Sequence, residues 1–538
     1  MFYEDREAAS IVPGLKKVLL CIGIFLGVPV WPQAITLTVD SQADAQDVNV
    51  GDGACATAQG ACTLRAAIQE TDALPGPDTI MVPAGTYLLE IPGAGEDASS
   101  SGDLDITDNL EIIGAGPDTT IIDACFPGAF PRVRAMEIIG PSQARISDMT
   151  IRNGSVGGDG GGIYVGSRFT HTGKLSLSNC LVRANEASNR GGGIHNEGTL
   201  ELFNCRIEEN ATENAGGGLS NNSDATLTVT ESTISGNGGP GTRFGLQGGG
   251  IINRGTLSVL RSTIVGNTSR AGGGGGIWNA GSVSLRNSTI SGNTASTGGA
   301  GGGIENFLGT VTINNSTVTD NLASGYAGGI YNQFETVTVQ NSIIALNRVF
   351  GFFAPDCNGQ ISSGGYNLIG NLSSCPFLSS IGDQVGIDPQ LRPLHDNGGP
   401  RLTHRLLTGS PALDSGNPAT PGSEPGACES NDQRGVTRPQ GAACDIGAFE
   451  LVPPVLAEID IKPGSQTNPI NLRSRGLILV AILSTPDLDA PGVVDRSSLT
   501  FGRSGDEQSF AFCEEDPEDV NLDGLDDLLC HFRTRWTG

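Results

Sequence analysis

A short phrase recurs seven times between Gly161 and Asn332, and it constrains the fold more than any other feature of the chain. Each copy has a pair of glycines, one aliphatic residue and one variable residue, and six of the seven copies then have Asn. Successive aliphatic positions lie 25 to 32 residues apart, a period typical of solenoids, in which each repeat packs only on its neighbours. The aliphatic positions are Ile163, Ile194, Leu219, Ile251, Ile277, Ile304 and Ile330.

A second phrase follows each glycine pair and alternates apolar with polar residues. In one copy Leu200 and Leu202 are separated by a single polar residue, and Ile207 follows a few positions later. Alternation with a period of two predicts strands with one buried face, so we expect three short strands in each repeat. Three strands per coil without a helical period predict an all-β, right-handed parallel β-helix, in which each strand pairs with its equivalent about 4.8 Å away.

Two polar columns of the repeat are interpreted as parts of the scaffold. One Asn per coil stands at a recurrent turn and is predicted to form a ladder of side-chain amides. An inward position holds Cys180 and Cys205 in two coils and Ser in later ones. We interpret these cysteines as small buried residues, and a disulfide between them is the alternative. The Asn column is Asn185, Asn210, Asn237, Asn267, Asn293, Asn321 and Asn347.

The regular repeats have less regular neighbours on both sides. Residues 35–140 are predicted to form an N-terminal cap and the first coils, residues 141–350 the regular repeats, and residues 351–451 the closing coils. Within the first region, the segment from Thr63 to Asp72 has a short helical pattern with one apolar face. A helix there is expected to cover the open end of the first coil, since an open end exposes strand edges.

The bulk composition excludes several classes of function. Asp and Glu total 58 against 31 for Lys and Arg, which gives a net charge of −27. Binding to nucleic acid or to an anionic membrane surface needs basic patches, so both are disfavoured, whereas binding of divalent cations is favoured. Aromatic residues make up only 5% of the chain and Gly numbers 79, so we do not expect a core of large side chains.

The N-terminus and the cysteines both predict export. Residues 1–34 are interpreted as a signal peptide, because Lys16 and Lys17 precede an apolar run, Val18 to Val30, that is too short to span a membrane. We expect a secreted or cell-surface monomer without a transmembrane segment. Most other cysteines lie in close sequence pairs that suit disulfides of an oxidising compartment. These pairs are Cys55 with Cys62, Cys357 with Cys375, Cys428 with Cys444, and Cys513 with Cys530, while Cys125 has no obvious partner.

Two regions of the chain resemble known exported proteins. The segment from Cys62 to Glu70 is similar to the CSLREA segment that opens many exported bacterial β-helix proteins. Phrases such as Gly409 to Asp414 and Asp445 to Glu450 resemble the choice-of-anchor Q region that closes such proteins. The glycine repeats are also similar to those of polymorphic outer-membrane proteins, which are surface adhesins. The resemblance covers residues 35–450 and implies an exported surface β-helix, without implying a reaction.

After Val452 the composition changes, and residues 455–538 are predicted to form a separate small β domain. A loop in this domain has oxygen ligands at positions 1, 3 and 5, Gly524 at position 6 and a further Asp at position 9. This spacing fits a Ca²⁺ loop and resembles the loops of dockerin and thrombospondin-type modules. An acidic turn without metal is the alternative, and truncation of the domain after Gly538 is one interpretation of its end. The candidate Ca²⁺ ligands are Asp519, Asn521, Asp523 and Asp527.

One column of the repeat varies freely and is the candidate for ligand contact. The residue after each aliphatic position should point away from the core, since its neighbour points inward. On three successive coils this residue is Trp278, Glu305 and Tyr331, a stripe that we expect to stack on sugar rings. A mixed solvent face partly covered by loops is the alternative. The long loop from Gly238 to Gln247 is expected to wall a groove beside the stripe.

Two functional hypotheses follow from these patterns. The preferred one is a non-catalytic exported β-helix for adhesion or for contact with an extracellular or cell-surface glycan. The alternative is a polysaccharide lyase or glycoside hydrolase acting on a polymer along the same scaffold. His195 lies four coils from Glu305, about 19 Å away, which is too far for one acid–base pair. No catalytic residue is assigned for this reason, and we lean against an enzyme.

Overall fold

The structure is a computed structural model that describes residues 34–534, apart from residues 94, 126–132, 167–171, 240–246, 271, 352–354, 454–456, 466–469, 472–474, 487, 497–498 and 503–508. The chain divides into two compact units, Met1–Leu451 and Val452–Gly538. The apolar run of the predicted signal peptide lies outside the described residues. Within the described part, no helix is long and apolar enough to cross a membrane.

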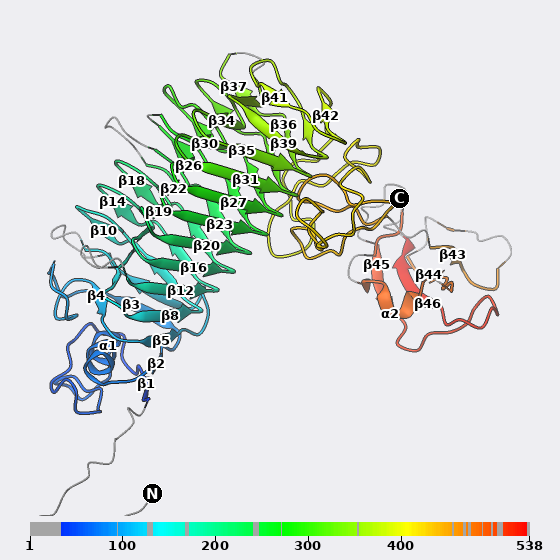
Figure 1. Cartoon of the computed structure of the whole chain (residues 1–538). Helices are drawn as coiled ribbons and strands as arrows, with labels where there is room; N and C mark the ends of the chain where they lie inside the picture. The colour runs from blue at the N-terminus through cyan, green and yellow to red at the C-terminus, as the bar shows by residue number, and fades with distance from the viewer. Residues whose placement is uncertain are drawn as a thin grey trace, which may run out of the picture. The chain divides into compact units, whose positions relative to one another are not determined.

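The first unit is a parallel β-helix, which confirms the predicted fold class (Figure 1). Three long parallel sheets, of thirteen, twelve and ten strands, form its sides. The first is β1 (Thr36–Thr38), β2 (Asp78–Met81), β5 (Leu110–Ile113), β8 (Gln143–Ser147), β12 (Lys174–Ser178), β16 (Thr199–Phe203), β20 (Thr226–Thr230), β23 (Thr256–Leu260), β27 (Ser282–Arg286), β31 (Thr310–Asn314), β35 (Val337–Gln340), β39 (Ile361–Gly365) and β41 (Phe377–Leu378).

The twelve-stranded sheet is β3 (Gly85–Leu88), β6 (Thr120–Asp123), β9 (Thr150–Arg152), β13 (Leu181–Arg183), β17 (Arg206–Glu208), β21 (Thr233–Ser235), β24 (Thr263–Val265), β28 (Thr289–Ser291), β32 (Thr317–Thr319), β36 (Ile343–Ala345), β40 (Leu368–Ile369) and β42 (Gln384–Val385). The ten-stranded sheet is β4 (Leu104–Ile106), β7 (Met136–Ile138), β11 (Ile163–Val165), β15 (Ile194–Asn196), β19 (Leu219–Asn221), β22 (Ile251–Asn253), β26 (Ile277–Asn279), β30 (Ile304–Asn306), β34 (Ile330–Asn332) and β38 (Cys357–Asn358).

Many coils also carry a fourth strand of two residues that the sequence pattern did not predict. These strands form two small parallel sheets along the side of the solenoid. They are β10 (Ser155–Val156), β14 (Glu186–Ala187) and β18 (Ala211–Thr212) in one sheet, and β25 (Thr268–Ser269), β29 (Thr294–Ala295), β33 (Leu322–Ala323) and β37 (Arg348–Val349) in the other.

The core of the solenoid consists of like residues stacked on like. Ile251 pairs with Ile277, which pairs with Ile304, and all three side chains are fully buried. This stacking gives a continuous apolar column without large aromatic residues, in agreement with the low aromatic content. Burial of this apolar area is the main favourable contribution to folding.

Two ladders of Asn side chains run parallel to the apolar columns. In the predicted ladder, Asn267 Nδ2 donates to Asn293 Oδ1 at 2.9 Å, and the same bond recurs between neighbouring coils. The ladder ends on a carboxylate, because Asn347 Nδ2 donates to Asp356 Oδ1 at 2.9 Å. A second ladder consists of Asn196, Asn221, Asn253, Asn279, Asn306 and Asn332, the last residues of the repeated phrase.

The column that contains Cys180 and Cys205 is buried, as predicted, and the two thiols are not bonded to each other. The Cys205 N–H donates to Ser232 Oγ at 3.0 Å, so the cysteines continue the serine ladder of the later coils. All four predicted cysteine pairs form disulfides, which confirms the pairing by sequence proximity. Cys125 is exposed and free.

Helix α1 (Leu64–Ala73) lies at the N-terminal end of the solenoid, where the sequence predicts a cap (Figure 1). Thr63 caps its N-terminus by accepting a hydrogen bond from the Ala66 N–H. Arg65 is fully buried, forms an ion pair with Asp44 at 2.6 Å and donates to the Gly102 carbonyl at 2.7 Å. A buried charge needs such partners, so Arg65 fixes the helix against two loops.

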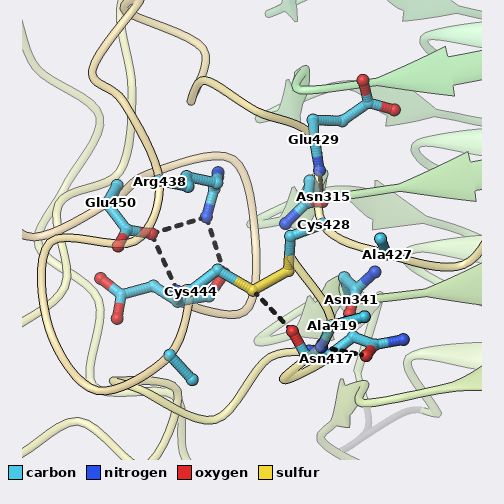
Figure 2. The surroundings of a disulfide bond; sticks show 12 residues. Asn315, Asn341, Asn417, Ala419, Ala427, Cys428, Glu429, Arg438, Cys444 and Glu450 are labelled. Atoms are coloured by element: carbon cyan, nitrogen blue, oxygen red, sulfur yellow. Dashed lines mark hydrogen bonds and ion pairs between the residues drawn. A yellow bond between two sulfur atoms is a disulfide. The ribbon is translucent and has the colours of Figure 1, made fainter. Parts of the chain in front are cut away.

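The last part of the first unit, residues 389–451, folds back along the outside of earlier coils (Figure 1). Arg401 donates to Asn204 Oδ1 at 2.7 Å, and Thr289 donates to Gln433 Oε1 at 2.6 Å. Figure 2 shows the Cys428–Cys444 disulfide beside the Arg438–Glu450 ion pair, which measures 2.9 Å and is buried. We call residues 389–451 the closing segment.

Among its described residues, the second unit has one antiparallel sheet and one short α-helix. The sheet order is β43 (Ile459–Ile461), β44 (Leu477–Ile482), β46 (Leu528–Arg533) and β45 (Phe510–Cys513), and the helix is α2 (Ala490–Val493). The Cys513–Cys530 disulfide joins β45 to β46. A small apolar core around Val480 and Phe532 holds the sheet together.

Candidate functional site

The structure places the predicted stripe on three neighbouring strands of the ten-stranded sheet. Trp278 pairs with Glu305 and Glu305 with Tyr331, so the three residues are adjacent rungs as expected. Their side chains are outside the apolar core column, but Trp278 is only 5% exposed and Glu305 only 7%. The stripe is therefore not the open face that the alternation of strand residues predicted, and Tyr331 alone is partly exposed.

The glycine segments explain this burial. A Cβ atom added to Gly274 would lie 1.9 Å from the Ile277 carbonyl oxygen and 2.9 Å from the Glu305 nitrogen. At Gly301 the added atom would lie 2.0 Å from the Ile304 carbonyl oxygen. The chain before each aliphatic residue thus runs back against the backbone of the strand that it enters. Only glycine permits this approach, and the approach covers the residue that follows the aliphatic position.

Aromatic residues near the buried stripe reach the surface. The Trp278 ring stacks on Phe307 with 5.5 Å between ring centroids, and Phe307 meets the edge of Phe334 at 5.9 Å. Phe334 is 63% exposed. Tyr331 stacks on Tyr326 at 4.8 Å, and Tyr326 is 56% exposed. We call Trp278, Phe307, Tyr326, Tyr331 and Phe334 the aromatic ridge.

Sequence reasoning missed three members of the aromatic ridge because they lie outside the repeated phrase. Phe307 and Phe334 follow Asn306 and Asn332 at different intervals, and Tyr326 precedes a glycine pair. The sequence does carry one signal for these residues, which is a local enrichment of aromatic residues. Five aromatic residues occur among positions 278–334, about 9% of that segment, whereas aromatic residues make up 5% of the whole sequence.

Glu305 is a buried carboxyl group beneath the aromatic ridge. Burial raises its pKa to about 7, against a smaller opposing effect of the Trp278 indole. Its Oε2 atom has no hydrogen-bond partner among the described residues. The rungs on either side of it are Trp278 and Tyr331, so its neighbours on the column are aromatic side chains rather than a second carboxylate.

The N-terminal end of the same column holds three acidic groups. Asp103, Asp105 and Glu137 bring one ligand atom each within 4.8 Å of one another. Arg134 forms ion pairs with both Asp103 and Glu137, so a guanidinium already compensates this cluster. Burial, followed by the charge of Asp103, raises the pKa of Asp105 to about 8. The ion pairs of Arg134 with two of the three acidic groups favour a structural role for this cluster.

Tyr164 and His195 occupy the next rungs of the column and are fully buried. Their ring centroids are 5.2 Å apart, and His195 Nε2 lies 3.3 Å from Glu197 Oε1. Burial and the neighbouring Glu197 carboxylate raise the pKa of Tyr164 well above its usual range. These groups are enclosed, so their position favours packing over contact with a polymer.

The predicted Ca²⁺ loop has an acidic turn at its surface. Asp519 Oδ2 accepts the Gly524 N–H at 2.8 Å, and Asn521 Oδ1 accepts the Asp523 N–H at 3.0 Å. Asp527 differs, because it is fully buried and its two oxygens accept N–H groups of Ser484 and Val520. The candidate ligands that remain are Asn521 and Asp523, which are exposed, and Asp519, which is half-buried. The loop expected to wall a groove lies mostly outside the described residues, at 240–246.

Comparison with known proteins gives solved structures only. No family model and no curated protein matches the chain. The pectate lyase Pel9A is similar, with a TM-score of 0.42 and 14% identity over 78% of this chain and 97% of that one. The A-modules of the Azotobacter vinelandii mannuronan C-5 epimerases AlgE6 and AlgE4 each have 15% identity, with TM-scores of 0.29 and 0.27. They cover 60% and 65% of this chain and 95% and 98% of their own.

Proposed function

We propose that this chain is an exported, non-catalytic β-helix that binds glycans through the aromatic ridge. The observation that carries the proposal is the pair of exposed rings, Phe334 and Tyr326. Phe334 meets Phe307 of the preceding coil, and Tyr326 stacks on Tyr331 of its own repeat. Aromatic faces bury the apolar faces of ring-shaped ligands, and exposed clusters of them mark interaction sites on soluble proteins.

The scaffold behind the ridge suits recognition of an extended polymer. Phe307 and Tyr331 are held between stacked coils, so their rings lose little conformational freedom when a ligand binds. Successive coils repeat at the strand spacing of about 4.8 Å, which presents equivalent positions along a line. A chain of sugar units matches such a surface better than a compact ligand does.

The proposal leaves out catalysis because the carboxyl group nearest to the ridge is buried between aromatic rungs. Glycoside hydrolysis needs two carboxyl groups flanking the bond, and Glu305 has aromatic neighbours on its column. The alternative function, a lyase or hydrolase, makes a different prediction. It expects release of reducing ends or unsaturated products from a polymer, and loss of that release in Glu305→Gln.

The test is glycan binding by the full chain on a panel of soluble oligosaccharides and insoluble polysaccharides. We expect Phe334→Ala and Tyr326→Ala each to weaken binding about fivefold, since a ring contact of this kind contributes about 1 kcal/mol. Phe203→Ala is the matched control, because Phe203 is 49% exposed on β16, outside the ridge. Unchanged binding in both ridge variants, or turnover that depends on Glu305, overturns the proposal.

Export and Ca²⁺ binding belong to the same proposal. Four disulfides in the described residues support folding in an oxidising compartment, in line with the apolar N-terminal segment. We propose that Asp519, Asn521 and Asp523 bind Ca²⁺. Calorimetric titration of the full chain with Ca²⁺ should show binding that Asp523→Ala removes and Asp460→Ala, in the same unit, retains. No heat of binding at millimolar Ca²⁺ would rule this site out.

A further inference from the structure

Two arginines beside the aromatic ridge have no acidic partner, although the chain has 58 acidic residues against 31 basic ones. Fully buried arginines have acidic partners, as Arg65 has Asp44 and Arg438 has Glu450. In the described part of the chain, Arg190 and Arg254 form no ion pair and no side-chain hydrogen bond, and both are only partly exposed. Half-buried guanidinium groups without an acceptor are costly, so they point to a ligand that supplies one.

The fold brings these two arginines to one side of the solenoid, because Arg190 bridges to Ala215, which belongs to the apolar cluster of Trp278, and Arg254 stacks on Trp278. Arg190 precedes the glycine pair of the coil that carries His195, and its backbone bridges to Ala215 in the next coil. Arg254 follows Asn253 at the end of β22, one coil further on. Burial, followed by the positive charge of Arg190, lowers the pKa of Arg254.

Each of these arginines has a buried donor that lacks an acceptor. Arg190 Nε and Arg254 Nη1 are buried atoms without a hydrogen-bond partner among the described residues. Each unsatisfied buried donor costs about 1–3 kcal/mol, and a single oxyanion with several lone pairs would satisfy them together.

The arginine pair is continuous with the aromatic ridge. The Arg254 guanidinium carbon lies 5.4 Å from the centroid of the Trp278 ring, which stacks on Phe307 at 5.5 Å. A stacked arginine keeps its planar edge free for a bidentate contact with a carboxylate or sulfate. A ligand that lies along the ridge would therefore place an anionic group at its Arg254 end.

We propose that Arg190 and Arg254 form an oxyanion subsite at one end of the aromatic ridge, and that the bound polymer is an acidic glycan. The shared chemistry is a planar or tetrahedral oxyanion on a sugar, which is a uronate carboxylate or a sulfate ester. The identity of the polymer rests on the proposed glycan function, whereas the anion subsite does not.

The test measures binding of three oligosaccharides of equal length to the full chain: a uronate oligomer, a sulfated oligomer and a neutral one. We expect the acidic oligomers to bind more tightly than the neutral one, and Arg254→Gln to weaken acidic binding at least tenfold with neutral binding unchanged. Arg254→Lys keeps the positive charge but removes the planar, forked guanidinium group. Its affinity for the acidic oligomers should lie between those of the unchanged chain and of Arg254→Gln. Arg183→Gln is the control, since Arg183 pairs with Glu209 at the surface. Whichever acidic oligomer binds more tightly shows whether the oxyanion is a uronate carboxylate or a sulfate ester.

Free galacturonate and inorganic sulfate separate this inference from the proposed function. If Phe334→Ala weakens all oligosaccharides while Arg254→Gln weakens none, the subsite is wrong and glycan binding stands. If no oligosaccharide binds but the free anions bind and Arg254→Gln abolishes that binding, the subsite stands and the glycan function is wrong. Absence of both kinds of binding in a folded chain overturns both.

Discussion

Asn267 shows how one amide side chain joins three coils. Its Oδ1 accepts the backbone N–H and the Nδ2 of Asn237, and its Nδ2 donates to the Ile234 carbonyl and to Asn293 Oδ1, all within 2.9–3.0 Å. The residue is fully buried, so these four bonds take the place of the hydrogen bonds that its amide would make with water. Loss of the side chain leaves several buried polar groups unsatisfied at once.

Asn267→Ala is expected to lower the free energy of unfolding of the first unit by about 3 kcal/mol or more, since each unsatisfied buried group costs about 1–3 kcal/mol. Asn214→Ala is the matched control. Asn214 makes one exposed side-chain bond, to Asn189, and its loss should cost less than about 1 kcal/mol. Denaturant unfolding of both variants checks this, and equal losses would mean that the ladder contributes little.

The repeated phrase predicts the residues whose roles recur on every coil, such as the Ile column and the Asn267 ladder. It does not predict Trp278 and Glu305 correctly, because alternation along a strand says nothing about a second layer of backbone over the outer face. That layer depends on the close approach at Gly274, a tertiary contact. The sequence pattern did not indicate Arg190 and Arg254 for a related reason, since no other coil has an arginine at the equivalent position of the repeat.

At the scale of the element, the closing segment packs along the side of the solenoid and is hydrogen-bonded to several of its coils. It has little regular secondary structure, so its backbone groups are satisfied by coils that lie far away in the sequence. Asn287 donates to the Asn431 carbonyl at 2.7 Å, and the Gly447 N–H donates to the Asn341 carbonyl at 2.8 Å. The Cys428–Cys444 disulfide and the buried Arg438 fix this segment internally (Figure 2).

The solenoid ends illustrate which elements a sequence pattern can indicate. Helix α1 was predicted because its apolar face recurs with a helical period. The termination of the Asn ladder on Asp356 was not predicted, because the ladder changes residue type at its last rung. Physically the change is reasonable, since the amide column presents N–H groups at this end and a carboxylate only accepts hydrogen bonds.

At the scale of the whole molecule, buried carboxyl groups link the stability of the solenoid to pH. Burial raises the pKa of Asp72 to about 6, of Glu305 and Asp445 to about 7, and of Asp105 to about 8. All four groups belong to the first unit. Their usual values lie near 4, so between pH 4 and pH 8 the folded state binds more protons than the unfolded state does.

The free energy of unfolding should therefore fall as pH rises, because stability decreases with pH wherever the folded state holds the extra protons. The contribution of each group is complete below its unfolded pKa and is lost as pH passes through its folded pKa. Each unit of pKa difference corresponds to about 1.4 kcal/mol, so the four groups together predict a drop on the order of 10 kcal/mol between pH 5 and pH 8. Denaturant unfolding at constant ionic strength measures it. Glu305→Gln removes one of the four groups and should flatten the profile mainly near pH 7, whereas a profile that rises with pH would show that these carboxyl groups are ionised in the folded chain.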